Sequence, residues 1–506
     1  MKILFIFPNA NSQTGFHYGI AHMSAVLKQA GHSVHLLQLC EHIAPLPSQT
    51  EFINTIQSLA PDVIGFSVVT NQWPYARTLA SWARQATTVP LVCGGIHTMA
   101  AGEDILTTSD FDYIIRGEAE YAFLDFIEAL ENGADVSGLH HVGFIRNGKV
   151  QMNPVGPLPD LRKLPFKDYE IFDFQHIIDA KDGWVGLMGS RGCPFSCTYC
   201  FNHQMVKQYR ADLHCSLKQL NYIRHFDVTD IIKEIQYLLA NYRNIKMFIF
   251  DDDLFTFYRD YVTEFCREYK KVCSLPFTVN AHVGAFDRDR ARDLAGANCR
   301  IVKFGVESGS ERIRKQVMAR HMKNESIIEA IHTAQEFGLH ASVFLMIGLP
   351  DETREDVMAT IKLMGQALPG RFRWTFFFPY PGTQAYEITA RTMNIDHDRM
   401  AELKNFTERS CMDFGEEHNL FLRKVGRVMP WFVNALSGLP VAEFYREKIR
   451  DVLAMDASAW EKTADDLYEE DKVYSADFVK QGLRHYAIKY NPFMGVISDY
   501  FIKEQF

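Results

Sequence analysis

The sequence has no apolar run that approaches the roughly 20 residues a membrane-spanning helix needs, and we therefore expect no membrane span. It also has no excess of basic residues, because 53 Lys and Arg stand against 62 Asp and Glu and give a formal net charge of −9. A general nucleic-acid binder usually presents a basic face, so we expect no nucleic-acid partner. The opening residues, MKILFIF, are too short for the apolar core of a signal peptide, and we expect a cytoplasmic protein.

The ten cysteines are scattered and do not form the dense framework of a small disulfide-bonded domain. Three of them, Cys193, Cys197 and Cys200, nevertheless fall within eight positions of the stretch RGCPFSCTYCFNH. In a reducing compartment, clustered thiols indicate a metal site or catalysis. Two metals fit this pattern: zinc in a Cys3His structural site completed by His203, or an iron–sulfur cubane with one iron left for another molecule. A third alternative is that the cysteines only pack in a loop.

Residues 1–135 alternate short apolar runs with helical patterns. The runs span residues 2–7, 33–39, 62–69, 90–95 and 112–117, and they are continuous, as in parallel strands that are covered on both faces. Five strand–helix units in a row predict an α/β fold that begins with a doubly wound, Rossmann-like parallel sheet. Such a sheet binds ligands at the carboxyl ends of its strands. The residues near these ends are Asn9, Ser12, Ser67, Thr70, Asn71, Trp73, Gly94, Gly95, His97, Gly117 and Glu118.

The rest of the chain divides at a proline-rich segment. A β-hairpin is predicted around Asn147–Gly148, and four prolines within residues 153–165 indicate a linker. Six further strands, at residues 184–192, 245–253, 277–283, 301–308, 341–350 and 373–383, predict a partial (β/α)6 barrel with its chemistry at the strand carboxyl ends. Beyond them the pattern is mainly helical. We therefore expect a first domain over residues 1–150, a linker over 151–182, a barrel over 183–385 and a helical domain over 386–506.

The spacing Cys193-x3-Cys197-x2-Cys200, on the loop after the first barrel strand, resembles the signature of radical S-adenosylmethionine (SAM) enzymes. In that family the three cysteines hold a [4Fe-4S] cluster, and the amino and carboxyl groups of SAM chelate the remaining iron. Reduction of the cluster cleaves SAM and yields a 5′-deoxyadenosyl radical, which abstracts hydrogen. The resemblance makes the three cysteines the expected catalytic and metal-binding residues, and it makes His203 a loop residue rather than a ligand.

Further elements of that family recur in order over residues 183–383. The resemblance implies SAM contacts at Tyr199, Phe201, Asp251, Asp252, Glu307, Ser308, Ile347 and Gly348. The aromatic pair and the Ile347–Gly348 pair would lie along adenine, the two aspartates would meet the amino group, and the Glu307–Ser308 pair would contact the ribose or methionine part. Packing beside a cluster is the alternative for the aromatic residues, and a helix N-cap is the alternative for the aspartates. We expect Glu352 to be structural.

Residues 1–135 resemble the cobalamin-binding domain that precedes many radical SAM enzymes, most clearly in VCGGIHTMAAGEDIL and FDYIIRGEAEYAFLDFI. Gly94 and Gly95 would let the backbone approach a large planar group, with a tight strand-to-helix turn as the alternative. The Asp-x-His-x-x-Gly motif of domains that bind cobalt through histidine is absent after the first strand. The resemblance therefore implies base-off cobalamin without a histidine ligand. Among Asn71, Gln72 and Trp73 we favour Trp73 as a cap on the lower cobalt face, with packing as its alternative.

Together the two resemblances imply a cobalamin-dependent radical SAM enzyme, similar to the class B methyltransferases. The leading hypothesis is methylation of an unactivated carbon, or of a phosphinate phosphorus, in a small-molecule or natural-product substrate. The alternative is a non-methylating reaction such as oxidative cyclisation, ring contraction or hydroxylation, similar to that of a tetrapyrrole cyclase. A hypothesis of another class is a zinc-stabilised cobalamin carrier or sensor. An external electron donor such as flavodoxin or ferredoxin is the expected protein partner.

The sequence leaves the substrate open. We expect substrate contacts from the C-terminal region and from residues 202–226, which we interpret as a loop. The polar and aromatic residues of this loop are Lys207, Tyr209, Arg210, Lys218, Tyr222 and Arg224. They would suit an anionic or peptide substrate, and a solvated basic face is the alternative. Trp431 and Phe432 would suit an apolar substrate, although core packing is favoured for them.

Overall fold

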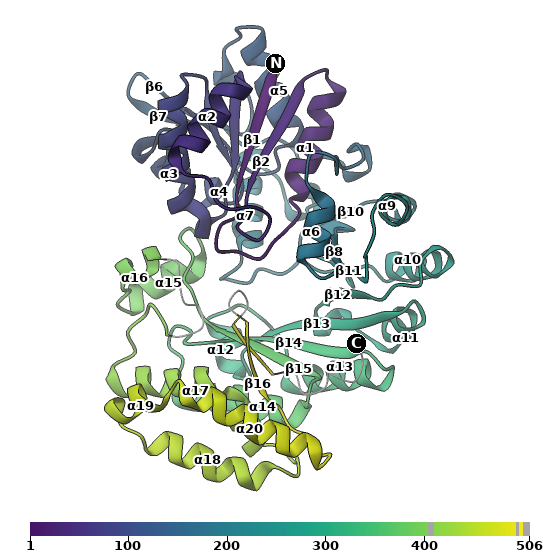
Figure 1. Ribbon diagram of the computed structural model, residues 1–506, viewed down its shortest axis with the longest axis vertical. Helices are drawn as coiled ribbons and strands as arrows, with labels where there is room; N and C mark the ends of the chain where they lie inside the picture. Colours follow the sequence, from purple (N-terminus) through teal and green to yellow (C-terminus); the bar gives the residue numbers. More distant parts are fainter. Residues whose placement is uncertain (403–408, 492–494, 499–506) are drawn as a thin grey trace. The chain divides into compact units, whose positions relative to one another are not determined.

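The computed structural model describes residues 1–402, 409–491 and 495–498, and the chain divides into two compact units (Figure 1). Unit 1 comprises Met1–Pro194, Cys200–Asp253 and Pro381–Thr383. Unit 2 comprises Phe195–Tyr199, Leu254–Tyr380 and Gln384–Phe506. The cysteine stretch is therefore shared between the two units. The domain boundaries predicted from the sequence do not coincide with the borders of the units, and they stay predictions.

Unit 1 begins with a seven-stranded sheet in the order β2-β1-β3-β4-β5-β6-β7. The first five strands are parallel: β1 (Lys2–Pro8), β2 (Ser33–Leu39), β3 (Val63–Ser67), β4 (Leu91–Gly94) and β5 (Tyr113–Ile115). The predicted doubly wound sheet is confirmed, and its order reverses between β1 and β3, where such sheets bind ligands. The predicted hairpin forms β6 (Val142–Arg146) and β7 (Lys149–Met152) and extends the sheet antiparallel at β5.

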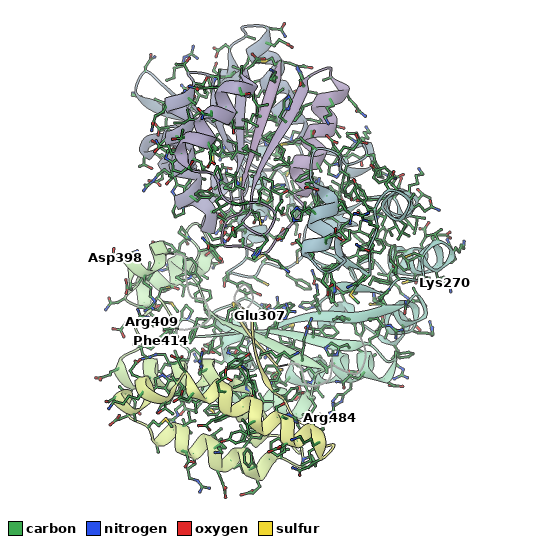
Figure 2. The ribbon with its side chains drawn as sticks, in the orientation of Figure 1. Lys270, Glu307, Asp398, Arg409, Phe414 and Arg484 are labelled. Carbon is green, nitrogen blue, oxygen red and sulfur yellow. The ribbon has the colours of Figure 1, made fainter. Side chains whose placement is uncertain are left out.

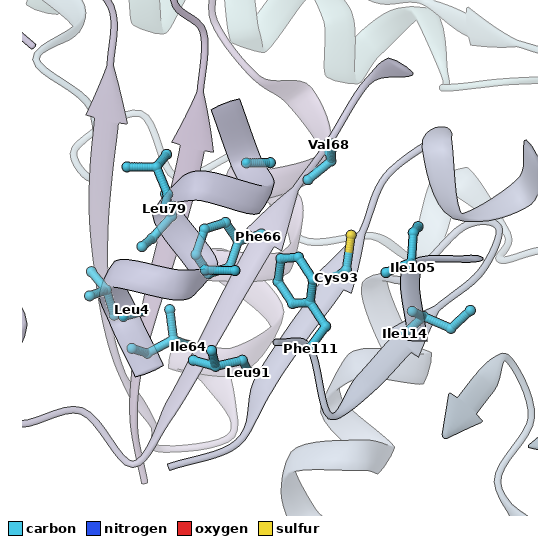
Figure 3. Close-up of a cluster of buried hydrophobic side chains, with 14 of the residues drawn as sticks. Leu4, Ile64, Phe66, Val68, Leu79, Leu91, Cys93, Ile105, Phe111 and Ile114 are labelled. Carbon is cyan, nitrogen blue, oxygen red and sulfur yellow. The ribbon is translucent and has the colours of Figure 1, made fainter. Parts of the chain in front are cut away.

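Helices cover both faces of this sheet. They are α1 (Tyr18–Gln29), α2 (Gln49–Leu59), α3 (Trp73–Ala86), α4 (His97–Thr108) and α5 (Glu120–Glu131). Helix α1 packs beside α5, and α2 packs beside α3. Figure 3 shows the core between strands and helices, where Leu4, Ile64, Phe66, Leu91 and Ile114 are each at most 2% exposed. Apolar side chains on both faces of each strand explain the continuous runs in the sequence.

The remainder of unit 1 contains the first two barrel strands, β8 (Trp184–Leu187) and β11 (Met247–Phe250), which pair in parallel. A short antiparallel pair, β9 (Ser190–Arg191) and β10 (Arg224–His225), lies in the chain between them. The helices are α6 (Phe174–Ala180), α7 (Phe201–Leu213), α8 (Leu217–Leu220) and α9 (Val228–Asn241). The predicted linker is packed rather than extended in solvent, because Val155, Leu161 and Tyr169 are at most 1% exposed.

The interpretation of residues 202–226 as a substrate loop is wrong in two respects. Most of the segment is helical, in α7 and α8. Its two tyrosines, Tyr209 and Tyr222, are buried in one apolar cluster with Val155 and Leu220. Arg224 is also buried and forms an ion pair with Glu118. These three side chains hold the segment in place and do not present a surface to a substrate.

Unit 2 contains the other four predicted barrel strands, all parallel: β12 (Phe277–Ala281), β13 (Cys299–Glu307), β14 (His340–Ile347) and β15 (Arg371–Phe376). The helices between them are α10 (Arg259–Val272), α11 (Arg288–Gly296), α12 (Glu311–Gln316), α13 (Asn324–Glu336) and α14 (Arg354–Ala367). Helix α10 precedes β12, and α14 starts at a capping box formed by Thr353 and Asp356. The predicted α/β class, with six strands of a barrel type after a first sheet, is confirmed.

The C-terminal region is mainly helical, as predicted. Its helices are α15 (Gln384–Thr392), α16 (His397–Glu402), α17 (Glu416–Ala435), α18 (Ala442–Ala454), α19 (Ala457–Thr463) and α20 (Asp466–Lys480). Two strands, β16 (Ile488–Asn491) and β17 (Gly495–Ser498), were not predicted, and β17 pairs antiparallel with β15. Trp431 and Phe432 are at most 1% exposed, so they belong to the core rather than to a substrate site. None of the described helices has the length and apolarity to cross a membrane.

Candidate functional site

The cysteine stretch follows β9 through a glycine that no other residue could replace without a shift. Gly192 has a φ of +92°, and a Cβ there would lie 2.4 Å from the carbonyl oxygen of Tyr222. Cys193 and Cys200 are half-buried, Cys197 is buried, and all three thiols are free of disulfides. Within residues 1–402, 409–491 and 495–498, no three or more Cys, His, Asp or Glu side chains are gathered as a metal-binding group. The gathering of the three thiols on one cluster therefore stays a prediction.

Two aspartates after β11 hold the backbone around the cysteines. The buried Asp252 accepts hydrogen bonds from the Gly189 N–H at 2.9 Å and from the Ser190 hydroxyl at 2.5 Å. Burial raises the pKa of Asp252 to about 7. Asp253 accepts from the Gly192 N–H at 3.1 Å and from Asn202 Nδ2 at 2.8 Å. The structure corrects the predicted contact of Asp252 with SAM, because both its oxygens are engaged within the chain.

Asp251, like Asp253 and unlike the buried Asp252, is exposed. It accepts a hydrogen bond from the Tyr18 hydroxyl at 2.7 Å, which joins the first residue of α1 to the residue after β11. Burial and the carboxylate of Asp251 raise the pKa of Tyr18. Asp251 thus remains a candidate for the amino group of SAM. Phe201 begins α7 directly after Cys200 and is half-buried.

Unit 2 surrounds Cys197 with a polar group that contains an arginine the sequence did not suggest. Arg320 Nη1 donates to the Cys197 sulfur at 3.4 Å and to the Tyr199 hydroxyl at 3.1 Å, and its Nη2 donates to the Gly305 carbonyl. Neighbouring Tyr199, Glu307 and Cys197 raise the pKa of Arg320, so it stays charged. The guanidinium thus links the sulfur of Cys197 to the Tyr199 hydroxyl and to the backbone of β13.

Glu307, marked in Figure 2, ends β13 in a conformation that residues with a side chain rarely adopt. Its φ is +69°, and such backbone strain typically costs about 1–3 kcal/mol and concentrates at functional sites. Burial raises the pKa of Glu307, while Arg320 and a hydrogen bond from Tyr199 oppose that rise. The structure therefore brings together three residues predicted from the sequence, Cys197, Tyr199 and Glu307, and adds Arg320 to them.

We expect Arg320→Met to slow SAM cleavage by about ten- to a hundredfold, the range for loss of a residue that orients a metal ligand. Arg320→Lys keeps the charge but loses the two-pronged guanidinium, and we expect an intermediate rate. The rate is measured as 5′-deoxyadenosine formed under a chemical reductant, with iron content measured in parallel. Arg300→Met is the matched control, since Arg300 is an exposed arginine at the start of β13. Equal rates in both methionine variants would mean that Arg320 has no part in the reaction.

Three other predicted SAM contacts are limited to the backbone. Ser308 is fully buried, lies 3.3 Å from the Thr360 hydroxyl and accepts from the Ser310 N–H at 3.2 Å. The Ile347 side chain is also fully buried, and its carbonyl accepts from the Phe377 N–H. The predicted contacts of Ser308 and Ile347 with SAM stay predictions, and their buried side chains leave the backbone as the part that could make them. Gly348, with a φ of +70°, remains a candidate for close approach of a ligand.

Glu352 holds the turn at Gly348, as expected of a structural residue. Its Oε2 accepts from the N–H groups of Gly348 and Leu349 at 2.6 and 3.2 Å. Burial raises the pKa of Glu352 to about 8, whereas an unfolded chain has the ordinary value near 4.3. The carboxyl group is thus protonated in the folded protein at neutral pH.

This raised pKa predicts a pH-dependent stability. The protonated Glu352 carboxyl stabilises the folded state fully below the unfolded pKa, and this stabilisation is lost as pH rises through about 8. Between the two pKa values the free energy of unfolding falls by about 1.4 kcal/mol per pH unit. We expect Glu352→Gln to remove this slope, so that the variant loses less stability than the parent between pH 5 and pH 8. Urea unfolding midpoints at several pH values measure the effect. Parallel pH profiles of parent and variant would contradict it.

At the carboxyl edge of the first sheet the backbone turns tightly at Gly95, directly against Val68. The φ of Gly95 is +89°, and a Cβ there would lie 2.5 Å from the Val68 carbonyl oxygen. At Gly94 a Cβ would meet nothing closer than 3.5 Å. Beside them His97 is 4% exposed and contacts the Thr70 hydroxyl at 3.3 Å through Nδ1. Its Nε2 is buried without a hydrogen-bond partner among the described residues.

The loops beside Gly95 are mostly held by contacts with other residues of the chain. Gln72 Nε2 donates to the Ala10 carbonyl at 2.7 Å and to the Ser12 hydroxyl at 3.3 Å. The Trp73 ring packs 4.9 Å from His97 and also stacks on Phe111. The side chain of Asn71 is exposed. These contacts favour packing for Trp73 and leave Asn71 as the candidate that faces a ligand in this loop.

The residues after β1 also lie at the carboxyl edge of the first sheet, and their histidine, His17, is not available to bind cobalt. His17 Nδ1 accepts from the Ile20 N–H at 3.1 Å, so Nε2 carries the proton and donates to the Ser67 hydroxyl at 2.8 Å. Burial lowers the pKa of His17 to about 4, and the ring is neutral. Asn9 is 8% exposed and donates to the Gln13 carbonyl. Both nitrogens of His17 are engaged, in agreement with the absence of the Asp-x-His-x-x-Gly motif.

Gly117 and Glu118, the predicted contacts after β5, have partners within unit 1. A Cβ at Gly117 would lie 2.3 Å from the Tyr209 hydroxyl, and the Glu118 N–H donates to that hydroxyl at 2.9 Å. The Glu118 carboxylate forms ion pairs with Arg191 and Arg224. The structure thus corrects the prediction that Gly117 and Glu118 contact a cofactor, because these interactions account for both residues.

Unit 2 has a cavity of about 470 Å³ near the end of β15. Its wall includes Phe376 and Leu422, and a Cβ at Gly348 would lie 3.5 and 3.7 Å from these two side chains. Charged residues also line it: Asp396, Arg399, Arg409, Asp413 and Arg423. Figure 2 marks Arg409 on this part of the chain. A bridge between Ile395 and Met412 fixes the two segments that supply most of the wall.

The donor groups fit the cofactors that the sequence implies. Three thiols outside any disulfide, one of them in contact with Arg320, suit iron or zinc. The unpartnered Nε2 of His97 suits a ligand that brings its own polar groups, since buried polar atoms in native proteins are normally paired. The strained Glu307 and the turn at Gly348 suit an amphoteric ligand with a flat ring.

Two sequence families match separate parts of the chain. The radical SAM superfamily matches residues 187–364, and the B12-binding domain matches residues 12–127. The first match contains the cysteine stretch, Glu307 and Gly348. The second contains the carboxyl edge of the first sheet. The radical SAM match covers all the residues assigned to the cluster and SAM, and the B12-binding match covers those assigned to cobalamin except Asn9.

Similar proteins include both methyltransferases and a cyclase. An uncharacterized methyltransferase of Pyrococcus horikoshii is 29% identical over 430 residues, which are 80% of this chain and 89% of the relative. The anaerobic magnesium-protoporphyrin IX monomethyl ester cyclase of Rubrivivax gelatinosus is 24% identical over 82% of this chain and 75% of its own length. The solved structure of TsrM from Kitasatospora setae, a radical SAM methyltransferase, has a TM-score of 0.62 at 17% identity and covers 77% of this chain and 76% of its own.

Proposed function

Because this chain is a radical SAM enzyme that carries a B12-binding domain, we propose that it is a methyltransferase. It moves a methyl group from SAM, by way of cobalamin, to an unactivated carbon or a phosphinate phosphorus of a small molecule. The observation that carries this proposal is the match to a relative named as a methyltransferase over 80% of the chain, across both cofactor domains. The zinc-bound carrier is not favoured, since a carrier has no use for a radical SAM domain.

The residues have separate tasks in this proposal. Cys193, Cys197 and Cys200 hold the cluster, which supplies the electron that cleaves SAM, while cobalamin supplies the route for the methyl group. Arg320 keeps a positive charge at Cys197 and orients the Tyr199 hydroxyl. Glu307 offers a carboxylate at the end of β13, and Glu352 fixes the turn that places Gly348 beside a flat ring. Cys197 and Gly348 are buried, which limits the access of water to this part of the site.

The substrate of the proposed reaction is a small molecule with charged groups. A volume of about 470 Å³ lies in the range of small-molecule sites, and three arginines and two aspartates line the cavity in unit 2. This cavity replaces the segment 202–226 as the candidate substrate site. The proposed electron donor is an external flavodoxin or ferredoxin.

A cyclisation without methyl transfer is the second candidate, and the likeness to the cyclase of Rubrivivax gelatinosus over 82% of this chain favours it. The two reactions differ in the fate of the SAM methyl group. In the methyltransferase, SAM would serve as a methyl donor as well as a radical source, so its methyl group would be found outside SAM after the reaction. In the second candidate SAM is used only for the radical.

The deciding experiment uses the anaerobically reconstituted protein with cobalamin, a reductant and SAM that carries a trideuterated methyl group. We expect the label in the cobalamin fraction and S-adenosylhomocysteine as the co-product, both measured by mass spectrometry. With a metabolite extract added, the label should pass to a product with a mass increase of a trideuteromethyl group. Production of 5′-deoxyadenosine without any transfer of label would overturn the methyltransferase and support the second candidate.

A further inference from the structure

A buried ion network in unit 1 joins the first sheet to the chain on both sides of Cys193 and Cys200. Glu118, in the loop after β5, pairs through Oε2 with Arg191 Nη1 at 2.7 Å and through Oε1 with Arg224. Arg191 pairs in addition with Glu120 at 2.7 Å. The four side chains are 4–14% exposed. Buried charges of this kind are stable only as a complete set, because the loss of one partner leaves another charge uncompensated.

The two arginines lie at defined places relative to the cysteines. Arg191 is in β9 and precedes Cys193 by two positions, and its strand partner in β10 is Arg224. Gly192, between Arg191 and Cys193, is pressed against the Tyr222 carbonyl oxygen. Glu118 therefore holds, through two guanidinium groups, both strands from which the first cysteine emerges.

The same loop also holds the chain that follows Cys200. The Tyr209 hydroxyl in α7 accepts the Glu118 N–H and fills the space beside Gly117. Helix α7 begins at Phe201. At its first turn Asn202 accepts from the Tyr222 hydroxyl at 2.5 Å and donates to Asp253 at 2.8 Å. Asp253 in turn accepts the Gly192 N–H, which closes a ring of contacts around the two cysteines.

We propose that Glu118 is a positioning residue for the iron–sulfur cluster, contributed by the B12-binding domain. Its carboxylate touches no reacting atom in this role. It sets the direction in which Cys193 leaves β9 and the direction in which α7 starts after Cys200. Residues that orient metal ligands through one intermediate contact typically change affinity or activity by about ten- to a hundredfold when they are lost. The cluster site is therefore completed by the first sheet and is not a property of the barrel alone.

This proposal rests on the presence of the cluster and not on the fate of the methyl group. Its failure can thus be told apart from failure of the methyltransferase proposal. The comparison uses the full chain, reconstituted anaerobically, as Glu118→Gln, as the double variant Glu118→Gln with Arg224→Met, and as Asp135→Asn. Asp135 is the matched control, because its ion pair with Arg146 in the same sheet is exposed.

The readouts are iron content, the thermal unfolding midpoint and the electron paramagnetic resonance spectrum of the reduced cluster with and without SAM. We expect Glu118→Gln to lower the unfolding midpoint and to shift or broaden the cluster spectrum. The double variant removes one charge of each sign, so its thermal unfolding midpoint should return toward that of the parent. Its cluster spectrum should stay altered, and its rate of SAM cleavage should stay about tenfold or more below that of the parent. Asp135→Asn should match the parent in every readout.

Two results would overturn the proposal. The first is a parent-like cluster spectrum in both Glu118 variants at equal iron content. The second is recovery of the spectrum together with the unfolding midpoint in the double variant, since that would show only a need for charge balance.

Discussion

Cys197→Ala abolishes the reductive cleavage of SAM and leaves cobalamin bound: this is the largest effect we expect from a single substitution. A [4Fe-4S] cluster is held by cysteine thiolates, and the chain offers three in this stretch, so the loss of one leaves two irons without a protein ligand. Cys197 is also the thiol that receives the Arg320 guanidinium. The B12-binding domain matches residues 12–127, away from Cys197 in the sequence, and should retain its ligand.

Cys266→Ala is the control for this prediction. Cys266 is a free thiol in α10 of the same unit and is 4% exposed, against 5% for Cys197. Both variants lose one buried sulfur, and only Cys197→Ala should lose iron, sulfide and 5′-deoxyadenosine formation. Cobalamin is quantified by its absorption spectrum after gel filtration. Cleavage of SAM by Cys197→Ala at the rate of the parent would refute the assignment of the cluster to this loop.

The strands and the cysteine motif could be predicted because their signals are local. A continuous apolar run such as residues 62–69 records burial on both faces of one strand, and Cys193, Cys197 and Cys200 are close in sequence. Helix α7 gave no such signal, since Tyr209 is the one residue of its thirteen that is buried. A helix that buries a single tyrosine has no apolar stripe at helical spacing, so its sequence pattern predicts a polar loop.

The residues that complete the site could not be predicted, because their partners are distant in sequence. Arg320 is 123 residues from Cys197, and Glu118 is 73 residues from Arg191 and 106 from Arg224. No spacing rule links such pairs. The sequence placed Asp252 and Ser308 at SAM through the resemblance, and Glu118 at a ligand through its position at the end of a strand. The structure shows that the side chains of these three residues bind other parts of the chain. Those partners are known only once the chain is folded.

The second large prediction concerns the cobalamin edge, where Gly94 rather than Gly95 is the position to substitute. A bulky residue at Gly95 would clash with Val68 whether or not cobalamin is present. Gly94 has room for a Cβ and a φ outside the left-handed region, so Gly94→Leu can fold and place its side chain at the ligand-binding edge. We expect cobalamin uptake to fall by at least about tenfold, since overpacking typically costs about 1–3 kcal/mol and a tenfold loss needs about 1.4 kcal/mol.

Two glycine variants separate this effect from backbone strain. Gly95→Ala and Gly31→Ala both place a side chain at a φ of +89°, but only Gly95 has atoms within 4 Å of the new Cβ. We expect Gly31→Ala to lower the unfolding midpoint slightly and to bind cobalamin like the parent, and Gly95→Ala to lose both stability and cobalamin. Gly94→Leu should keep the midpoint and the iron content of the parent and lose only cobalamin. If Gly94→Leu takes up cobalamin as well as the parent does, the corrin does not lie against the end of β4.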